Sequence, residues 1–232
     1  MKPNSLSIII PTYNEEKNIV TCINKIPKLK WKAEIIVVDD GTDNTAKLVE
    51  ELAQKRKNLT LLHFDKKLGQ GGAFLKGLEK ATGDVVVTLD ADYTVDPIEL
   101  EKIVSPIFDN EVDFVNTSRL IYPMERGAMK FTHYVGNKIF TLLTSLIIRK
   151  HLTDVFCGTK AFKRELLRGK LSEETWPALE LLFEAKKNRL KIKEIPVHYK
   201  ARKAGESKVS TFKTGYTHLK DILDKTKKYY FS

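Results

Sequence analysis

Short apolar runs alternate with segments of helical periodicity along the first half of this 232-residue chain. The runs are residues 6–10, 35–38, 59–64, 85–89 and 112–116. Between the first two runs, Ile19, Ile23 and Ile26 recur at the spacing of an amphipathic helix. Strands that alternate with helices predict a mostly parallel central sheet flanked by helices, an α/β and Rossmann-like fold with right-handed crossovers. The length suits a single domain of this class.

Acidic residues follow three of these runs at the point where each predicted strand ends. Glu15 follows the first run, Asp40 the second, and Asp90 and Asp92 the fourth. Because the carboxyl ends of parallel strands form the ligand crevice of such sheets, we expect these carboxylates to lie around one site. Strand alternation would place Asp90 and Asp92 on the same side of an extended backbone, with the small Ala91 between them.

The Asp90-Ala91-Asp92 tripeptide predicts a metal–diphosphate site. Two carboxylates so close together repel each other, and a hard divalent cation removes that repulsion. Mg²⁺ typically takes one or two carboxylates and completes its coordination with water and substrate phosphate oxygens. The tripeptide alone fits equally well a helix cap or a solvated turn.

A glycine-rich segment, residues 67–72 with the sequence KLGQGG, opens another predicted helix. It has neither the Walker A spacing nor the spacing of a dinucleotide-binding fingerprint, which disfavours P-loop kinases and dehydrogenases. Gly69 and its neighbours permit a ligand to approach the backbone at a helix N-terminus, where amide groups favour anions. A tight turn without a ligand is the alternative.

The charge balance predicts a negatively charged partner. The formal net charge is +10, with 40 Lys and Arg against 30 Asp and Glu. Nucleic acid, an anionic membrane surface and a phosphorylated substrate all fit this charge, but no nucleic-acid-binding motif is present, so nucleic acid is disfavoured. Cys22 and Cys157 show no paired spacing, which favours a reducing compartment without a disulfide or zinc framework. The first residues show no signal-peptide core, so we expect no secretion signal.

Two segments fit either a structural role or a membrane role. The apolar stretch 139–148, flanked by Lys138 and Arg149, is about half of the ~20 residues that a bilayer-spanning helix needs. It suits a core helix or a helix lying in the membrane interface. The basic amphipathic segment 214–232 suits a solvated helix or a membrane-surface anchor.

The strand–helix rhythm becomes irregular after residue 118. We expect a strand near residues 158–162, a helix at 176–188 and a strand at 195–199. We therefore divide the predicted domain, residues 1–213, into a regular Rossmann-like half (1–117) and a less regular half (118–213), followed by the segment 214–232.

Several motifs occur in a family-specific order. They read IIIPTYNEE, IIVVDDGTDNT, KLGQGGA, LDADYTVDP, LTDVFCGTKAFKR and EIPVHYKARKAGESK. Each motif is short, but the ordered set resembles family 2 glycosyltransferases of the dolichyl-phosphate mannose/glucose synthase type over residues 5 to about 210. The resemblance implies a GT-A fold, a nucleotide-diphosphate sugar donor, Mg²⁺ or Mn²⁺, and a polyprenyl or dolichyl phosphate acceptor. It also implies a nucleotide-binding half (1–117), an acceptor-binding half (118–213) and peripheral contact with the cytoplasmic face of the membrane.

The resemblance assigns the metal to Asp90 and Asp92, and the acceptor phosphate to Arg119 and Lys130. It also implies catalytic roles for Asp92, Arg119 and Asp154, with Asp154 near the sugar. Together with Gly69, the expected donor-binding residues are Pro11, Tyr13, Glu15, Asp40, Asp90, Ala91 and Arg202. The sequence departs from the family pattern at Thr94, where mannose synthases often have Gln.

A phosphate acceptor also follows from the chemistry. A phosphate monoester is anionic near neutral pH, since its second pKa is about 6, so it can attack the anomeric carbon without a general base. Hydroxyl acceptors need a carboxylate base, and relatives that use them carry a Glu-Asp pair near Glu180, where this chain lacks the Asp. We predict inverting transfer of a hexose from a GDP-mannose or UDP-glucose type donor to a polyprenyl phosphate. The alternatives are a soluble glycosyltransferase acting on a saccharide or small-molecule hydroxyl, and a binding module without turnover.

Overall fold

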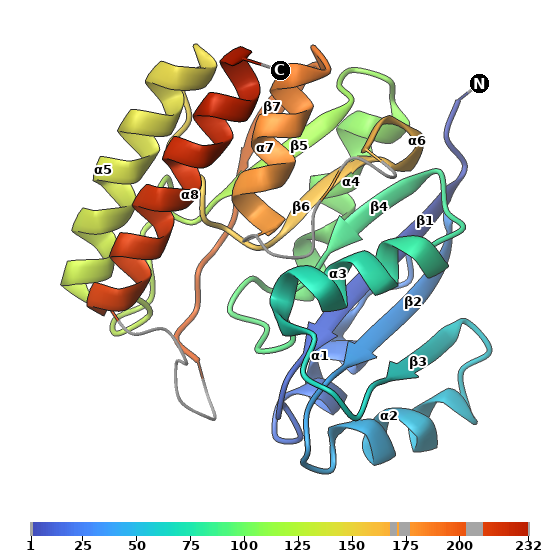
Figure 1. Ribbon diagram of the computed structural model, residues 1–232. Coiled ribbons are helices and arrows are strands. Elements are labelled where there is room, and N and C mark those ends of the chain that lie inside the picture. Colours follow the sequence, from blue (N-terminus) through green and yellow to red (C-terminus); the bar gives the residue numbers. More distant parts are fainter. Residues whose placement is uncertain (1, 168–170, 172–176, 203–210, 232) are drawn as a thin grey trace.

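The computed structural model of the protein describes residues 2–167, 171, 177–202 and 211–231. Residue 176, the predicted start of one helix, and residues 203–208 of the last family motif lie outside the described residues. Figure 1 shows one twisted sheet with helices on both faces. Within the described residues, seven strands are ordered β3 (Leu59–His63), β2 (Lys32–Asp39), β1 (Ser5–Thr12), β4 (Val85–Thr88), β6 (Lys160–Lys163), β5 (Phe114–Ser118) and β7 (Ile192–Pro196).

The sheet is mostly parallel, as the sequence predicts. Strands β3, β2, β1 and β4 pair in parallel, and so do β5 and β7. Strand β6 lies between β4 and β5 and runs antiparallel to both. The prediction of an α/β fold with a mostly parallel sheet flanked by helices is confirmed.

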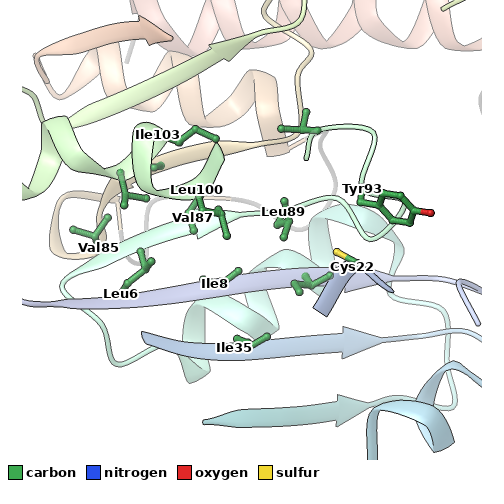
Figure 2. Packing of buried hydrophobic residues seen from close by; sticks show 14 of the residues in the cluster. Leu6, Ile8, Cys22, Ile35, Val85, Val87, Leu89, Tyr93, Leu100 and Ile103 are labelled. Carbon is green, nitrogen blue, oxygen red and sulfur yellow. The ribbon is translucent and has the colours of Figure 1, made fainter. Parts of the chain in front are cut away.

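The apolar runs of β1, β2, β4 and β5 form strands that are largely buried on both faces, as parallel strands usually are, whereas the edge strand β3 is only partly buried. On β1, Ile8 and Ile10 face a core that includes Leu100 and Ile103, whereas Ile9 faces the core on the other side. Figure 2 shows Leu6 and Ile8 pointing to the same side as Val85 and Val87. The first core is covered by α1 (Ile19–Lys25), α2 (Thr45–Ala53), the short helix η1 (Pro97–Glu99) and α4 (Leu100–Phe108).

The second core is covered by α3 (Gly69–Lys80) and α7 (Pro177–Lys187), with α6 (Arg164–Leu167) beside them. The long helices α5 (Phe131–Ile148) and α8 (Thr211–Phe231) lie side by side at the edge of the molecule away from β3 (Figure 1). None of the helices within the described residues is both long enough and apolar enough to cross a bilayer.

Element boundaries differ from the sequence prediction, most of all at β7 and α5. Strand β7 spans Ile192–Pro196 rather than 195–199, and Tyr199, beyond its end, forms a bridge to Val95. Helix α5 begins at Phe131, eight residues before the apolar stretch, and the stretch is divided between exposed residues (Ile139, Leu142, Leu143 and Leu146) and buried ones (Thr141, Thr144, Ser145 and Ile148). The expectation of a core helix at residues 139–148 therefore holds for only one side of α5.

Candidate active site

A cavity of about 380 Å³ lies at the carboxyl ends of the central strands. This volume is within the range of about 300 to 1,000 Å³ that is typical of small-molecule sites. Ten residues that the sequence singled out line it: Pro11, Tyr13, Glu15, Asp40, Gly69, Asp90, Ala91, Asp92, Arg119 and Arg202. The fold therefore brings together side chains that are separated by nearly the full length of the chain.

Asp40, at the end of β2, holds the glycine-rich segment. Its Oδ2 accepts hydrogen bonds from the backbone amides of Leu68 (2.7 Å) and Gly69 (2.8 Å). Gly69 has φ +72°, a left-handed conformation that glycine adopts without strain. The anion at the N-terminus of α3 is thus the carboxylate of Asp40 itself, which suits the partial positive charge of that helix end.

Residues that the sequence did not single out support this side of the cavity. The buried Asp39 accepts a hydrogen bond from Thr12 Oγ1 (2.8 Å), and its Oδ2 lies 2.9 Å from His63 Nδ1. These contacts tie together the carboxyl ends of three adjacent strands. Lys67 Nζ lies 3.9 Å from the centroid of the Tyr13 ring, which places a cation over an aromatic face at the cavity wall. Asp39 could have been found from its place beside Asp40, because successive residues of a strand face opposite sides, so Asp39 must face away from the position of Asp40.

Asp90 and Asp92 both line the cavity, but an extended backbone does not bring them there. Strand β4 ends at Thr88, and Asp92 lies in a turn in which its Oδ1 accepts hydrogen bonds from the amide and hydroxyl of Thr94 (3.2 and 2.9 Å). The turn continues with Tyr93 at φ +42°. The prediction from strand alternation was wrong, because the chain turns at these positions, although the two carboxylates still face the same cavity.

The two carboxylates of the acidic pair influence each other. Burial and, next in size, the neighbouring charge of Asp92 together raise the pKa of Asp90 to about 7, against the opposing charges of Arg119 and Lys160. Gly158 makes room for this carboxylate, since a Cβ at Gly158 would lie 2.5 Å from Asp90 Oδ1. Two carboxylates that face a cavity and repel each other fit a hard divalent cation. Within the described part of the chain no group of three or more His, Cys, Asp or Glu could hold a metal.

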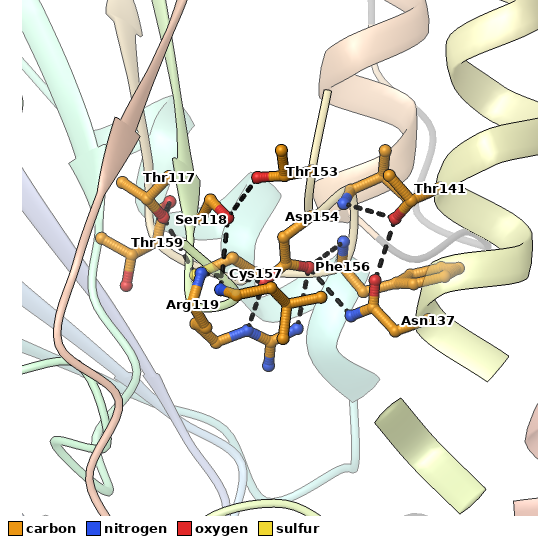
Figure 3. A network of polar contacts seen from close by, with 12 residues as sticks. Thr117, Ser118, Arg119, Asn137, Thr141, Thr153, Asp154, Phe156, Cys157 and Thr159 are labelled. Carbon is orange, nitrogen blue, oxygen red and sulfur yellow. Dashed lines mark hydrogen bonds and ion pairs between the residues drawn. The ribbon is translucent and has the colours of Figure 1, made fainter. Parts of the chain in front are cut away.

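Arg119, directly after β5, is held rigidly by Asp154. Its Nε donates to Asp154 Oδ2 (2.6 Å) and its Nη2 donates to Asp154 Oδ1 (3.0 Å), the paired geometry that fits a guanidinium to a carboxylate. Figure 3 shows Asn137 donating to the same carboxylate from α5, at 2.9 Å. The guanidinium carbon also lies 5.1 Å from the centroid of the Tyr199 ring. Among the described residues, no hydrogen bond uses the remaining nitrogen, Nη1.

Asp154 is fully buried and does not line the cavity. Burial by itself raises the pKa of this carboxyl, but the charge of Arg119 and hydrogen bonds from Arg119 and Asn137 outweigh burial and lower the pKa to about 2. The carboxylate is therefore ionised at neutral pH and positions Arg119. The sequence expectation placed Asp154 near the sugar, whereas its contacts place it behind Arg119.

The other two predicted cations differ in position. Arg202 lines the cavity, where its Nη2 pairs with Glu15 Oε1 and its Nη1 lies 3.6 Å from Asp92 Oδ2. Lys130 is exposed at the N-terminal end of α5 and is not among the residues that line the cavity.

Comparison with known proteins decides the family. The model of the family described as Glycosyl transferase family 2 matches residues 7–169. The chain belongs to this family. The predicted resemblance to family 2 glycosyltransferases is thereby confirmed.

Among its relatives, the family 2 chain is similar to the UDP-N-acetylglucosamine–dolichyl-phosphate N-acetylglucosaminyltransferase of Methanococcus voltae. The two are 34% identical, with 85% of this chain and 86% of the relative covered. The low-salt glycan biosynthesis hexosyltransferase Agl6 of Haloferax volcanii is 30% identical over 98% of this chain, which spans only 55% of that relative. The undecaprenyl-phosphate 4-deoxy-4-formamido-L-arabinose transferase of Proteus mirabilis is 31% identical, with 91% and 65% covered.

Solved structures support the fold of the family 2 domain. The glucosyl-3-phosphoglycerate synthase of Mycobacterium tuberculosis, crystallised with Mn²⁺, UDP and glucosyl-3-phosphoglycerate, has a TM-score of 0.69 and 20% identity, covering 97% of this chain and 80% of the synthase. Staphylococcus aureus TarS in complex with UDP-GlcNAc has a TM-score of 0.64 and 22% identity, covering 95% and 66%. At these identities the likeness concerns the GT-A fold alone.

Proposed function

We propose that this glycosyltransferase moves a hexose from a nucleotide-diphosphate sugar to a polyprenyl phosphate at the cytoplasmic face of a membrane. The observation that carries the proposal is that one cavity contains both an acidic pair, Asp90 and Asp92, and a fixed cation, Arg119. The acidic pair suits a metal-bound diphosphate, and the cation suits an anionic acceptor. The relatives named for dolichyl-phosphate and undecaprenyl-phosphate transferases support the same acceptor class.

On the donor side, Asp90 and Asp92 would hold Mg²⁺ or Mn²⁺, which when bound stabilises the negative charge of the leaving diphosphate. Arg202 now pairs with Glu15 and lies near Asp92. We expect it to turn to the donor diphosphate once a cation neutralises Asp92. Pro11, Tyr13, Glu15, Asp40, Gly69 and Ala91 form the wall on which the base and ribose would lie.

On the acceptor side, Arg119 is prepared to position a phosphate. Two of its nitrogens are committed to Asp154, so the direction of Nη1 is fixed before the acceptor arrives. A group fixed in this way orients a nucleophile without a further loss of side-chain entropy. In this proposal the acceptor phosphate attacks the anomeric carbon directly and inverts its configuration, Asp154 acts as the positioning residue, and Lys130 supplies a second cation beside α5.

One contact favours phosphate over hydroxyl acceptors. Glu180 occupies the region where relatives that use hydroxyls carry their acidic pair, but it is 4% exposed, and its Oε1 lies 3.7 Å from Lys225 Nζ of α8. It is not among the residues that line the cavity. A carboxylate in this position is poorly placed to take a proton from an acceptor hydroxyl, because a general base must lie within hydrogen-bond reach of that proton.

The test is transfer from a panel of radiolabelled GDP- and UDP-sugars to polyprenyl phosphate, with and without Mg²⁺ or Mn²⁺. Label that enters the organic phase from one donor, only with the cation, would support the proposal and name the sugar. Arg119→Ala should bind donor normally but lose transfer, whereas Asp92→Ala should lose metal-dependent donor binding. Label that enters a saccharide but no lipid would refute the acceptor class.

A further inference from the structure

Helix α5 exposes a continuous apolar face to the surroundings. Phe131 is 79% exposed, Leu142 61% and Leu146 66%, and Val135, Ile139 and Leu143 are also exposed. Their spacing along the helix gathers these six residues on one side, hereafter the outer face of α5. Large apolar patches of this kind on a protein surface mark interaction sites.

The inner face of α5 is mostly polar, although Ile148 at its end is buried in the second core. Its buried residues include Asn137, Thr141, Thr144 and Ser145. Thr141 donates to Asn137 Oδ1 (2.9 Å), and Asn137 donates to Asp154 (2.9 Å). The polar side of α5 is therefore used to hold the segment that positions Arg119, and the apolar side remains for a partner outside the chain.

The charges around this face indicate which partner fits. Residues 126–150 contain no Asp or Glu, and their basic residues are Arg126, Lys130, Lys138, Arg149 and Lys150. A second copy of this chain, docked face to face, would bring two such basic segments together at a cost in repulsion. An anionic lipid surface is complementary, since it accepts apolar side chains between its headgroups and attracts basic side chains at their edge.

The neighbouring helix extends the same edge of the molecule. Tyr230 of α8 donates a hydrogen bond to the backbone carbonyl of Ile147 on α5 (2.8 Å), and Leu219 and Leu223 of α8 are exposed. Figure 1 shows α5 and α8 side by side, with α5 beginning on the side of the sheet where β1 and β2 end. Its N-terminal end therefore lies on the same side as the cavity.

We propose that the outer face of α5 docks in the plane of an anionic lipid bilayer. The 18-residue helix, about 27 Å long, lies along the surface with its apolar residues among the headgroups and Lys138 and Arg149 at the lipid phosphates. Docking in this way fixes α5 at the membrane, with Asn137 on its inner face and the pair of Asp154 and Arg119 behind it. The link from docking to the acceptor rests on the proposed function, whereas docking itself does not.

Vesicle sedimentation tests the surface directly. The full chain should bind phosphatidylcholine vesicles that contain phosphatidylserine, and binding should weaken with added salt and without the anionic lipid. Leu142→Glu combined with Leu146→Glu should weaken binding at least tenfold, because each change puts a charge in the apolar contact. Lys138→Glu should weaken it more than fivefold, since removal of one basic residue alone accounts for about fivefold. Ile98→Glu is the matched control, since Ile98 is 67% exposed on η1 and lies outside α5.

Two results would overturn the proposal. One is equal vesicle binding by the wild type and the Leu142→Glu, Leu146→Glu variant, or no binding by either. The other is concentration-dependent dimerisation in lipid-free solution that the same variant abolishes while vesicle binding persists. Unchanged donor binding by the variant would establish that it is folded.

A transfer assay separates this proposal from the proposed function. With both correct, the Leu142→Glu, Leu146→Glu variant loses transfer to polyprenyl phosphate in vesicles but keeps transfer to a water-soluble short-chain isoprenyl phosphate. Specific vesicle binding without transfer to either acceptor would refute the proposed function and leave the docking surface supported.

Discussion

Replacing Asp154 by Asn is expected to destabilise the protein in a pH-dependent way. Asp154 is fully buried, and its interactions with Arg119 and Asn137 lower its pKa from 3.8 to about 2. A shift of this size corresponds to about 2 kcal/mol of the free energy of unfolding. Because the folded-state pKa lies below the unfolded value, this contribution is present above about pH 4 and is lost as the pH falls toward about 2.

Asp154→Asn removes the charge but keeps the shape of the side chain. Arg119 then remains largely buried without its counter-ion, and breaking one side of a buried ion pair costs about 3 to 5 kcal/mol. We expect a loss near the lower end of this range at neutral pH, because the side chain of Arg119 keeps 14% exposure and the Asn carbonyl still accepts one hydrogen bond. The difference from the wild type should shrink in acid.

Urea denaturation followed by circular dichroism, repeated from about pH 7 down to about pH 3, measures both effects. The matched control is Glu111→Gln, which breaks an ion pair with Lys193 in which both side chains are about half exposed. That change should cost less than about 1 kcal/mol. Equal losses in the two variants, or a difference that stays constant as the pH falls, would refute the reasoning about Asp154.

Three further changes test the site and the core. Gly158→Ala should weaken metal-dependent donor binding at least tenfold in calorimetric titrations, since the new Cβ would lie 2.5 Å from Asp90 Oδ1. Gly136→Ala, whose Cβ would have nothing within 4 Å, should leave donor binding unchanged. Equal effects of the two changes would contradict the role of Gly158 in making room for Asp90. Gly77→Ala should cost about 1 to 3 kcal/mol of stability in urea, because its Cβ would lie 2.4 Å from Ile9 Cγ2, and an unchanged midpoint would count against it. Asp90→Asn should stabilise the metal-free protein above about pH 7, because the raised pKa of Asp90 means that the wild type loses stability as the pH rises from about 4 to about 7. The gain in stability should fade toward about pH 4. A gain that does not depend on pH would show that the charge of Asp90 is not its cause.

Periodicity predicted the architecture well where the local pattern and the tertiary environment agree. The strands β1, β2 and β4 are largely buried on both faces, so their apolar runs are continuous and distinct from the helical segments between them. The hydrophobic pattern mispredicted the start of β7. This strand lies at the edge of the sheet, where the polar residues Lys193 and Glu194 are accommodated within it. The pattern also failed after β4, where no residue type announces that the chain turns before Asp92.

The cavity residues could be predicted as a set because the ends of parallel strands meet at one edge. Their pairings could not be predicted in the same way. Whether Asp154 faces a sugar or the back of Arg119 depends on the path of residues 149–159 between α5 and β6, which local sequence does not determine. Asp40 likewise bonds the amides of Leu68 and Gly69, which are 28 and 29 residues distant.

By itself, the sequence determined the α/β class, the family and the acidic edge of the sheet, because these depend on residue type and on spacing along the chain. Only the tertiary structure decided which charges neutralise each other and which side of α5 faces outward. These depend on contacts between distant segments, and a helix with an apolar side and a polar side has the same sequence pattern whichever side the rest of the protein covers. In α5 the buried side is mostly polar, and there Asn137 donates to Asp154 and Thr141 accepts a hydrogen bond from the backbone amide of Val155.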